Sequence, residues 1–205
     1  RRQRQMCIRD SIVDEFEMKD GTPFSWNNAT HVQNMYYDKA GNPTRDPRFY
    51  RTVLANGMKF MKTQIDTYEG GRFGAPVTGA TLTGYYLKKL VNETVVLTPP
   101  NTVSKNHHFP TYRYAEVLLN YAEALNEWQG PDYTDANCTI SARQALNQVR
   151  QAAGMPDVKG AGDQNSFRTA VRHERRVELA FEDHRFWDIR RWKIGNVVEQ
   201  IYGVH

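Results

Sequence analysis

The stretch RYAEVLLNYAEALNEWQG, residues 113–130, decides the fold. Within it, apolar residues recur at steps of three and four and form one stripe along a predicted helix over 113–128, namely Ala115, Leu118, Ala122 and Leu125. Gly130 and Pro131 follow, a pair that is typical of a helix end. Small alanines on the inner face let a neighbouring helix approach closely, so this segment predicts close helix–helix packing.

Two further helices are predicted after this one. The second spans about 139–153, with Thr139 as its N-cap and Gly154 followed by Pro156 as its stop. Its apolar residues repeat the same spacing at Ala142, Ala145, Leu146, Val149 and Ala153. The third spans about 166–182, with Ser166 as its N-cap. The first two resemble one tetratricopeptide-like hairpin, the unit that stacks into α-solenoids, so Leu118 and Leu146 are expected in one shared core.

The chain before these helices has a different character. Residues 12–48 contain turn signals and look irregular, and a short helix is expected to begin at Asp46-Pro47. Residues 58–98 hold β-favouring runs such as 94–97, broken by glycines. The predicted fold class is therefore mainly α, with one helix hairpin, long irregular loops and minor β structure.

The first eleven residues are set apart by their origin. Arg1–Ser11 reads codon by codon as a translation of an adapter used in transposon-based sequencing libraries. We therefore predict that 1–11 is not native and that 12–205 is a fragment of a single domain, truncated at both ends. The formal net charge is +4, of which residues 1–11 supply +3 and the remainder +1. A nearly neutral chain gives no electrostatic case for a nucleic-acid partner.

Six segments, taken in order, resemble the C-terminal half of SusD/RagB proteins. They are FEMKDG at 16–21, RDPRFY at 45–50, TGYYLKK at 83–89, RYAEVLLNYAEA at 113–124, ALNQVR with AGMP within 145–156, and ERRVEL through Arg191-Trp192 within 174–192. Their order and spacing agree over about 12–195, which is nearly the whole natural chain, so the resemblance is specific.

The resemblance implies a fold and a function. SusD-like proteins are mainly helical, are lipid-anchored on the outer face of the outer membrane of Gram-negative bacteria, and cover a SusC-like TonB-dependent transporter. They bind oligosaccharides or other nutrients and pass them inward, with no catalysis and no cofactor. For this chain the expected function is binding of nutrient glycans at the cell surface and their delivery to such a transporter.

Residues 24–37 hold the candidate ligand-binding groups. Sugars require flat apolar faces for their C–H side and amides or charges for their hydroxyls. Both kinds of group occur here, and the candidates are Trp26, Asn27, Asn28, Asn34, Tyr36 and Tyr37. At most one of the adjacent Tyr36 and Tyr37 is expected to face a ligand. The alternative interpretation is ordinary packing of aromatic rings under an irregular segment.

A column of acids lies in the last family-like segment, at Glu174, Glu178 and Glu182. Arginines near in sequence are expected to pair with them: Arg175, Arg185, Arg190 and Arg191. A structural motif of Arg175, Glu178, Arg185 and Asp188 is expected to be largely buried and paired. The reason is that the flanking apolar residues must find a core; they are Val177, Leu179, Phe181, Phe186, Trp187 and Trp192.

Other kinds of site are not supported by the sequence. His107, His108, His173 and His184 lack any metal-ligand spacing, so no metal and no catalytic residue is predicted. Two alternative functions remain open. The first is an α-solenoid scaffold that binds peptides, which would explain 113–154 but not the aromatic loop. The second is a glycoside hydrolase that uses Glu174 or Glu182.

Overall fold

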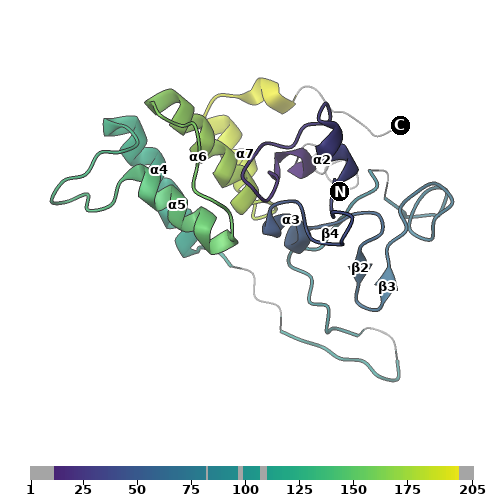
Figure 1. Ribbon diagram of the computed structural model, residues 1–205. Coiled ribbons are helices and arrows are strands. Elements are labelled where there is room, and N and C mark those ends of the chain that lie inside the picture. The colour runs from purple at the N-terminus through teal and green to yellow at the C-terminus, as the bar shows by residue number, and fades with distance from the viewer. Residues whose placement is uncertain (1–11, 82, 97–98, 107–109, 199–205) are drawn as a thin grey trace. The chain divides into compact units, whose positions relative to one another are not determined.

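The computed structural model describes residues 12–81, 83–96, 99–106 and 110–198 (Figure 1). Contacts divide the chain into two compact units, one that contains Tyr50–Thr111 and one that contains Ser11–Phe49 and Tyr112–Gln200. We call the second the helical unit. Residues 1–11 lie outside the described residues, so their adapter origin stays a prediction.

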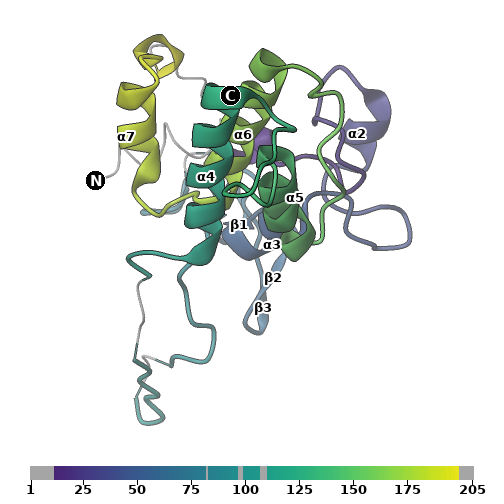
Figure 2. The ribbon, with the colours of Figure 1, turned by 90° about the vertical axis from the view of Figure 1, so that its left-hand side faces the viewer.

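Three helices pack together in the helical unit: α4 (Tyr114–Gln129), α5 (Ala142–Ala153) and α6 (Gln164–Glu178). α4 contacts both α5 and α6, and α5 contacts α6 (Figure 2). The backbone N–H of Arg143 donates to the carbonyl of Pro131 at 2.9 Å, which places the start of α5 at the end of α4. The two helices therefore form the predicted antiparallel hairpin.

One hydrophobic core lies between these helices. Leu118 and Leu146 both belong to it, which confirms the prediction of a shared core. Its other buried members are Leu119, Ala122, Leu125, Ala142, Ala145, Val149, Ala161, Phe167, Val171 and Leu179. Alanines line the inner faces of α4 and α5, as the close approach of two helices requires.

The helix N-termini differ from the predicted ones by two or three residues. α5 is capped by Ser141 and not by Thr139, because Ser141 and Gln144 form a reciprocal capping box. α6 is capped by Asp163, whose carboxylate accepts from the N–H groups of Asn165 and Ser166. Ser166, the predicted cap, is the third residue of the helix and completes the box. The predicted stop of α5 is confirmed, since Gly154 adopts a left-handed φ of 82°.

The predicted third helix ends earlier than residue 182. α6 stops at Glu178, and Phe181 and Asp183 both adopt φ of 64°, which a continuous helix does not allow. The chain then begins α7 (His184–Arg191) and a short 3₁₀ turn, η1 (Gly195–Val198). Glu182 therefore lies in the turn after α6 and not on a helix face.

Residues 16–46 of the helical unit are mostly irregular, as predicted, whereas 12–15, just before them, are helical. α2 (Ala29–Gln33) forms inside the segment that was expected to be a loop. The side chain of Asn28 caps this helix by accepting from the N–H groups of Thr30 and His31. Phe16 and Phe49 are fully buried and their rings meet edge to face, with centroids 5.6 Å apart.

The unit that contains Tyr50–Thr111 carries the small amount of β structure. It begins within α3 (Pro47–Thr52), the predicted short helix, which is followed by β1 (Val53–Leu54), β2 (Lys59–Phe60), β3 (Thr63–Gln64) and β4 (Tyr86–Leu87). β1 pairs antiparallel with β4, and β2 with β3. Of the β run expected at 94–97, the described part contributes one bridge, from Val96 to Val103. The fold class, mainly α with minor β, is confirmed.

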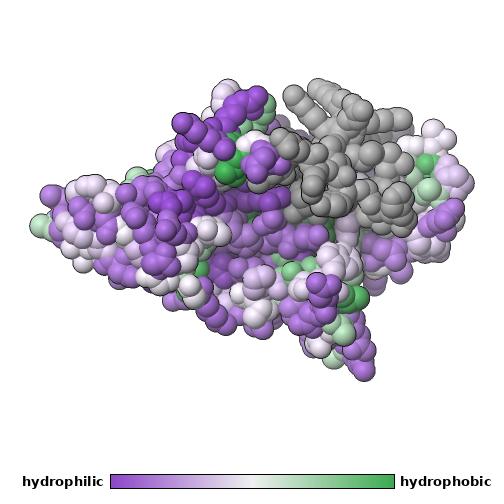
Figure 3. Space-filling model, turned by 90° about the horizontal axis from the view of Figure 1, so that it is seen from above, coloured by the Kyte–Doolittle hydropathy of each residue, from purple (hydrophilic) through white to green (hydrophobic). Residues whose placement is uncertain are grey.

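The visible surface of the helices is largely hydrophilic (Figure 3). This agrees with the mean hydropathy of −0.71 for the chain. Within the described ranges, no helix combines the length and the apolar character that crossing a bilayer requires.

Candidate functional site

The segment 24–37, which we call the aromatic loop, presents the ring of Trp26 to the surface. Trp26 is 54% exposed. Its indole N–H donates to the carboxylate of Asp14 at 3.2 Å, and its ring meets that of Phe24 edge to face at 5.2 Å between centroids. Two independent contacts therefore hold the ring while leaving much of it open to solvent.

A fully buried arginine underlies the loop. The guanidinium of Arg45 lies 4.0 Å from the centroid of Phe24 and 5.4 Å from that of Phe49. Its Nη2 donates to the carbonyl oxygens of Val13 and Phe16 at 2.7 and 2.6 Å. Arg45 thus connects Phe24, whose ring contacts Trp26, to the backbone carbonyls of Val13 and Phe16. Sequence reasoning did not single it out, although it opens the family-like RDPRFY segment.

The two adjacent tyrosines have different surroundings. The ring of Tyr36 stacks on buried Phe49, with centroids 5.5 Å apart and planes 6° from parallel. Tyr37 is exposed, and its backbone forms a bridge with Pro43. Tyr36 therefore contributes to packing, and Tyr37 is the tyrosine of the pair at the surface.

The three candidate asparagines differ in exposure and in the hydrogen bonds that they form. Asn27 is exposed, and so is Asn28, whose side-chain oxygen is occupied by its capping bonds to α2. Asn34 is half-buried, and its backbone carbonyl accepts a hydrogen bond from the hydroxyl of Thr44 at 2.6 Å. The exposed groups of the aromatic loop are therefore the indole of Trp26, the phenol of Tyr37 and the side-chain amides of Asn27 and Asn28. These groups are suited to a sugar ring and its hydroxyls.

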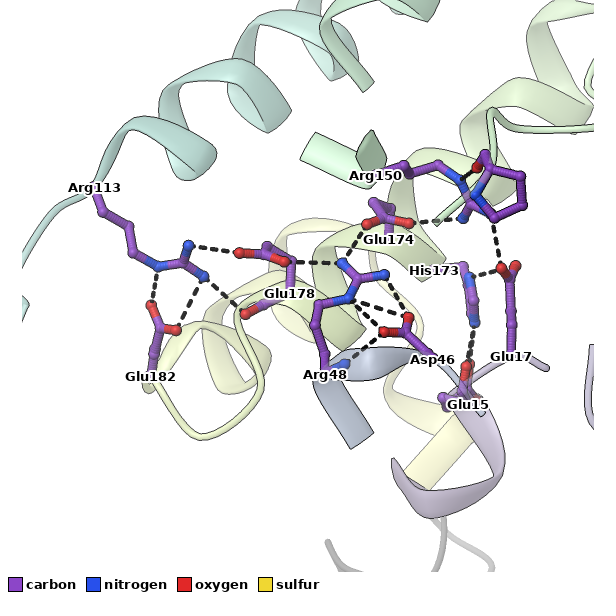
Figure 4. A network of polar contacts seen from close by, with 11 residues as sticks. Glu15, Glu17, Asp46, Arg48, Arg113, Arg150, His173, Glu174, Glu178 and Glu182 are labelled. Carbon is purple, nitrogen blue, oxygen red and sulfur yellow. Dashed lines mark hydrogen bonds and ion pairs between the residues drawn. The ribbon is translucent and has the colours of Figure 1, made fainter. Parts of the chain in front are cut away.

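The acid column predicted at 174–182 belongs to a buried ion network (Figure 4). We use this name for Glu17, Asp46, Arg48, Arg113, Arg150, Glu174, Glu178 and Glu182. Arg48 lies at its centre: it contacts Glu174, bonds Glu178 at 2.8 Å, and holds both carboxylate oxygens of Asp46. It thereby joins the start of α3 to α6.

Two more arginines extend the network. Arg150 at the end of α5 bonds Glu174 at 2.9 Å and Glu17 at 2.8 Å. Arg113, just before α4, bonds Glu178 at 2.6 Å and Glu182 at 2.8 Å. The buried ion network therefore connects α4, α5 and α6.

These partners correct the prediction. The acid column was expected to pair with Arg175, Arg185, Arg190 and Arg191, but it pairs with Arg48, Arg113 and Arg150, which come from other segments of the chain. Arg190 instead lies over the ring of Phe186, at 3.4 Å from its centroid.

The predicted motif at 175–188 is assembled in part. Arg175 and Asp188 are buried, and the Nε of Arg175 donates to both carboxylate oxygens at 2.9 and 2.8 Å. Glu178 is mostly buried, but its partners are Arg48 and Arg113. Arg185 differs from the prediction because it is only half-buried; burial and the neighbouring charge of Arg176 lower the pKa of its guanidinium.

Two of the flanking aromatic residues also differ from the prediction. Phe186 and Trp187 were expected to find a core, but both are exposed, Trp187 by 67%. Successive residues of a helix are turned by about 100°. Because Asp188 points inward to Arg175, its two predecessors on α7 point elsewhere. Val177, Leu179 and Trp192 are buried as expected.

His173 and His184 both lie next to acidic residues. The Nε2 of His173 donates to the carbonyl of Glu15 at 2.7 Å, and Nδ1 lies 3.7 Å from the carboxylate of Glu17. The Nε2 of His184 lies 3.6 Å from Glu116. Within the part of the chain that the structure describes, no three His, Cys, Asp or Glu side chains gather closely enough to hold a metal ion. His107 and His108 lie outside the described residues.

The charge state of Glu178 gives a pH prediction. Burial raises the pKa of its carboxyl, but Arg48 and Arg113 outweigh burial and hold the pKa below the ordinary 4.5. The folded state therefore stabilises the ionised form. This stability is complete above pH 4.5 and is lost as the pH falls through the lower folded pKa, because the unfolded chain binds the proton first.

We expect urea unfolding of the full-length protein to show a free energy of unfolding that falls as the pH is lowered below 4.5. In Glu178→Gln the acid-dependent loss should be smaller than in the wild type. Parallel pH curves for the two proteins would mean that Glu178 does not contribute through its charge.

The chain is similar to known proteins in both sequence and structure. The model of the SusD family matches residues 3–203. SusD-like protein P25 of Formosa agariphila is 37% identical over 171 residues, which cover 82% of this chain and 27% of that protein. A SusD-like carbohydrate binding protein from Bacteroides fragilis, of known structure, is 34% identical with a TM-score of 0.69, over 92% of this chain and 36% of that one.

A second SusD-like protein from Bacteroides fragilis is 32% identical, also with a TM-score of 0.69, and the match covers 90% of this chain and 36% of that chain. The chain thus spans about a quarter to a third of the length of these relatives. The family match extends over nearly the whole chain, and the identities exceed 30%. This chain belongs to the SusD family.

Proposed function

We propose that the protein carrying this chain binds nutrient glycans at the outer face of the outer membrane, where a lipid anchor holds it, and delivers them to a SusC-like TonB-dependent transporter. Membership of the SusD family supports this proposal. The name of the Bacteroides fragilis relative, a carbohydrate binding protein, supports the ligand class.

The single observation that carries the proposal is the setting of Trp26. Its ring is exposed at the surface but fixed by Asp14 and Phe24, and Phe24 in turn lies on the guanidinium of Arg45. A ring fixed in advance binds a sugar face with little loss of conformational freedom. The amides of Asn27 and Asn28 are adjacent in the chain and supply hydrogen bonds to hydroxyls.

The buried ion network supports binding without hydrolysis. A glycosidase needs one carboxyl that is protonated near neutral pH as a general acid. Glu174 contacts Arg48 and Arg150, and both oxygens of Glu182 accept from Arg113. Both carboxylates are bonded to guanidiniums within the fold, so neither is placed to donate a proton to a bound sugar. We therefore propose that the protein is not an enzyme.

Replacement of Trp26 tests this proposal. We expect Trp26→Ala in the full-length protein to weaken oligosaccharide binding by about 5- to 30-fold, because loss of a stacking ring costs on the order of 1–2 kcal/mol. The thermal midpoint should stay close to that of the wild type, since the ring is largely exposed. Titration calorimetry measures the affinity.

Trp187→Ala is the matched control. Trp187 is similarly exposed, and its ring meets that of Phe186 edge to face at 5.1 Å, much as Trp26 meets Phe24. The control should bind like the wild type. If the control loses binding and Trp26→Ala keeps it, the site lies on α7 instead. Tight binding of peptides and of no glycan would favour the scaffold alternative.

A further inference from the structure

Asp14 brings a carboxylate to the edge of the Trp26 ring. It lies in the helical residues 12–15 and is exposed. One of its oxygens, Oδ2, accepts the indole N–H of Trp26 at 3.2 Å. A carboxylate offers about four acceptor positions over its two oxygens, so one bond from the indole leaves acceptor capacity unused. Asp14 can therefore hold the ring and accept a hydrogen bond from a ligand at the same time.

A sugar that stacks on Trp26 brings hydroxyls toward this carboxylate. Stacking places the C–H side of the sugar on the aromatic face, and the equatorial hydroxyls then project outward past the edge of the ring. The carboxylate of Asp14 lies at that edge, because it is bonded to the indole nitrogen. A hydroxyl that donates to a carboxylate forms a charge-assisted hydrogen bond, which is roughly twice as strong as a bond between neutral groups.

Asp14 also sets the charge of this surface. Residues 24–37 contain no Lys, Arg, Asp or Glu. The Nδ1 of His31 accepts the backbone N–H of Ser25 at 3.2 Å, a role that an uncharged imidazole performs. Arg45 is fully buried, and its guanidinium donates to backbone carbonyls. The charged group that contacts the exposed ring is thus an acid.

Several neighbours act on the carboxyl of Asp14. Burial raises its pKa above the ordinary 3.8, and the charge of Glu15 acts in the same direction. The hydrogen bond from Trp26 and the positive charge of Arg45 oppose this rise in the pKa. These last two interactions favour the ionised carboxylate, which is the form that accepts hydroxyls and repels anions.

We infer that Asp14 is a ligand-binding residue of the Trp26 site, and that it makes this site select neutral glycans over glycans that carry carboxylate or sulfate groups. An acidic sugar stacked on Trp26 would bring a second negative charge next to Asp14, and like charges repel. The inference rests on the proposed glycan-binding function and adds the class of ligand. Asp14 lies twelve residues from Trp26 in the sequence, so the aromatic loop alone does not reveal it.

Titration calorimetry of the full-length wild-type protein tests the ligand class. The neutral probes are tetrasaccharides of β-glucan, xylan and mannan, and the acidic probes are tetrasaccharides of polygalacturonate, alginate and sulfated galactan. The tightest ligand should be neutral. An acidic tetrasaccharide as the tightest ligand would overturn the inference and leave glycan binding in place. Absence of binding to every probe would instead contradict the proposed function, and the inference with it.

Asp14→Asn separates ligand binding from support of the ring. Asparagine keeps an acceptor for the indole N–H but lacks the charge. Affinity for the neutral probes should fall on the order of five-fold, because a neutral hydrogen bond replaces a charge-assisted one, and the preference over acidic probes should shrink. Unchanged binding of all probes would overturn the inference. Loss of affinity by the same factor for neutral and acidic probes would also overturn it, because Asp14 would then only support the ring.

Asp183→Asn is the matched control for this substitution. Asp183 is exposed, its side chain forms no capping bond to α7, and asparagine tolerates its left-handed φ of 64°. The control removes the same charge from the helical unit without touching Trp26, so it should bind every probe like the wild type. Equal effects of Asp14→Asn and Asp183→Asn would show that net charge, and not the position of Asp14, decides the preference, and would overturn the inference.

Discussion

Glu174→Gln is expected to lower the free energy of unfolding of the full-length protein by about 3–5 kcal/mol. The side chain of Glu174 is only 1% exposed, and its two oxygens contact Arg48 and Arg150. Replacement by the neutral amide leaves both guanidiniums buried with less compensating charge. Urea unfolding, analysed by linear extrapolation, measures the change.

Glu127→Gln provides the matched control for this change. Glu127 of α4 likewise bonds an arginine of another helix, Arg168 of α6, but both of these side chains are substantially exposed. Exposed ion pairs contribute about 0–1 kcal/mol, so the control should stay within that range. Equal effects for Glu174→Gln and Glu127→Gln would show that the buried ion network does not hold the helical unit together.

Leu146→Ala is expected to lower the free energy of unfolding by about 2–5 kcal/mol. Leu146 is fully buried in the core between α4, α5 and α6, so truncation leaves a cavity among closely packed helices. Leu118→Ala, on the facing helix, should have an effect in the same range. Urea unfolding of the full-length protein measures both.

An exposed aliphatic residue is the control for the core substitutions. Val32 in α2 is 38% exposed, and Val32→Ala should change the free energy of unfolding by about 0.5 kcal/mol or less. If Leu146→Ala and Leu118→Ala fall well below 2 kcal/mol, the two leucines do not share a core and the hairpin is paired incorrectly.

The hairpin was predictable because its signal is local. The apolar stripe of α4 and the glycine stop of α5 follow from residues three or four positions apart. The exact caps were harder to predict, since Thr139 and Ser141 are both competent. Gln144, three residues after Ser141, decides between them by closing the capping box.

The partners of the acid column were not predictable from sequence spacing. Arg48 and Glu174 are separated by 126 residues, and Arg113 and Glu178 by 65. Arginines near in sequence were the natural expectation, but the turn after α6 carries Glu182 off the helix and toward Arg113. Only the tertiary fold brings these groups together.

The aromatic loop was found by its residue types, but the role of each ring depends on the fold. Tyr36 and Tyr37 are equivalent in the sequence, and stacking on buried Phe49 separates them. Phe186 and Trp187 were expected inside because apolar residues tend to be buried. The inward direction of Asp188 places them outside instead.

Titration calorimetry of the full-length protein against a panel of oligosaccharides, with analysis of the sugars after incubation, tests the central claim most directly. We predict that at least one oligosaccharide binds and is recovered intact, and that its affinity depends on Trp26. Release of shorter sugars, or the absence of binding to every glycan together with tight binding of a peptide, would contradict the proposed function.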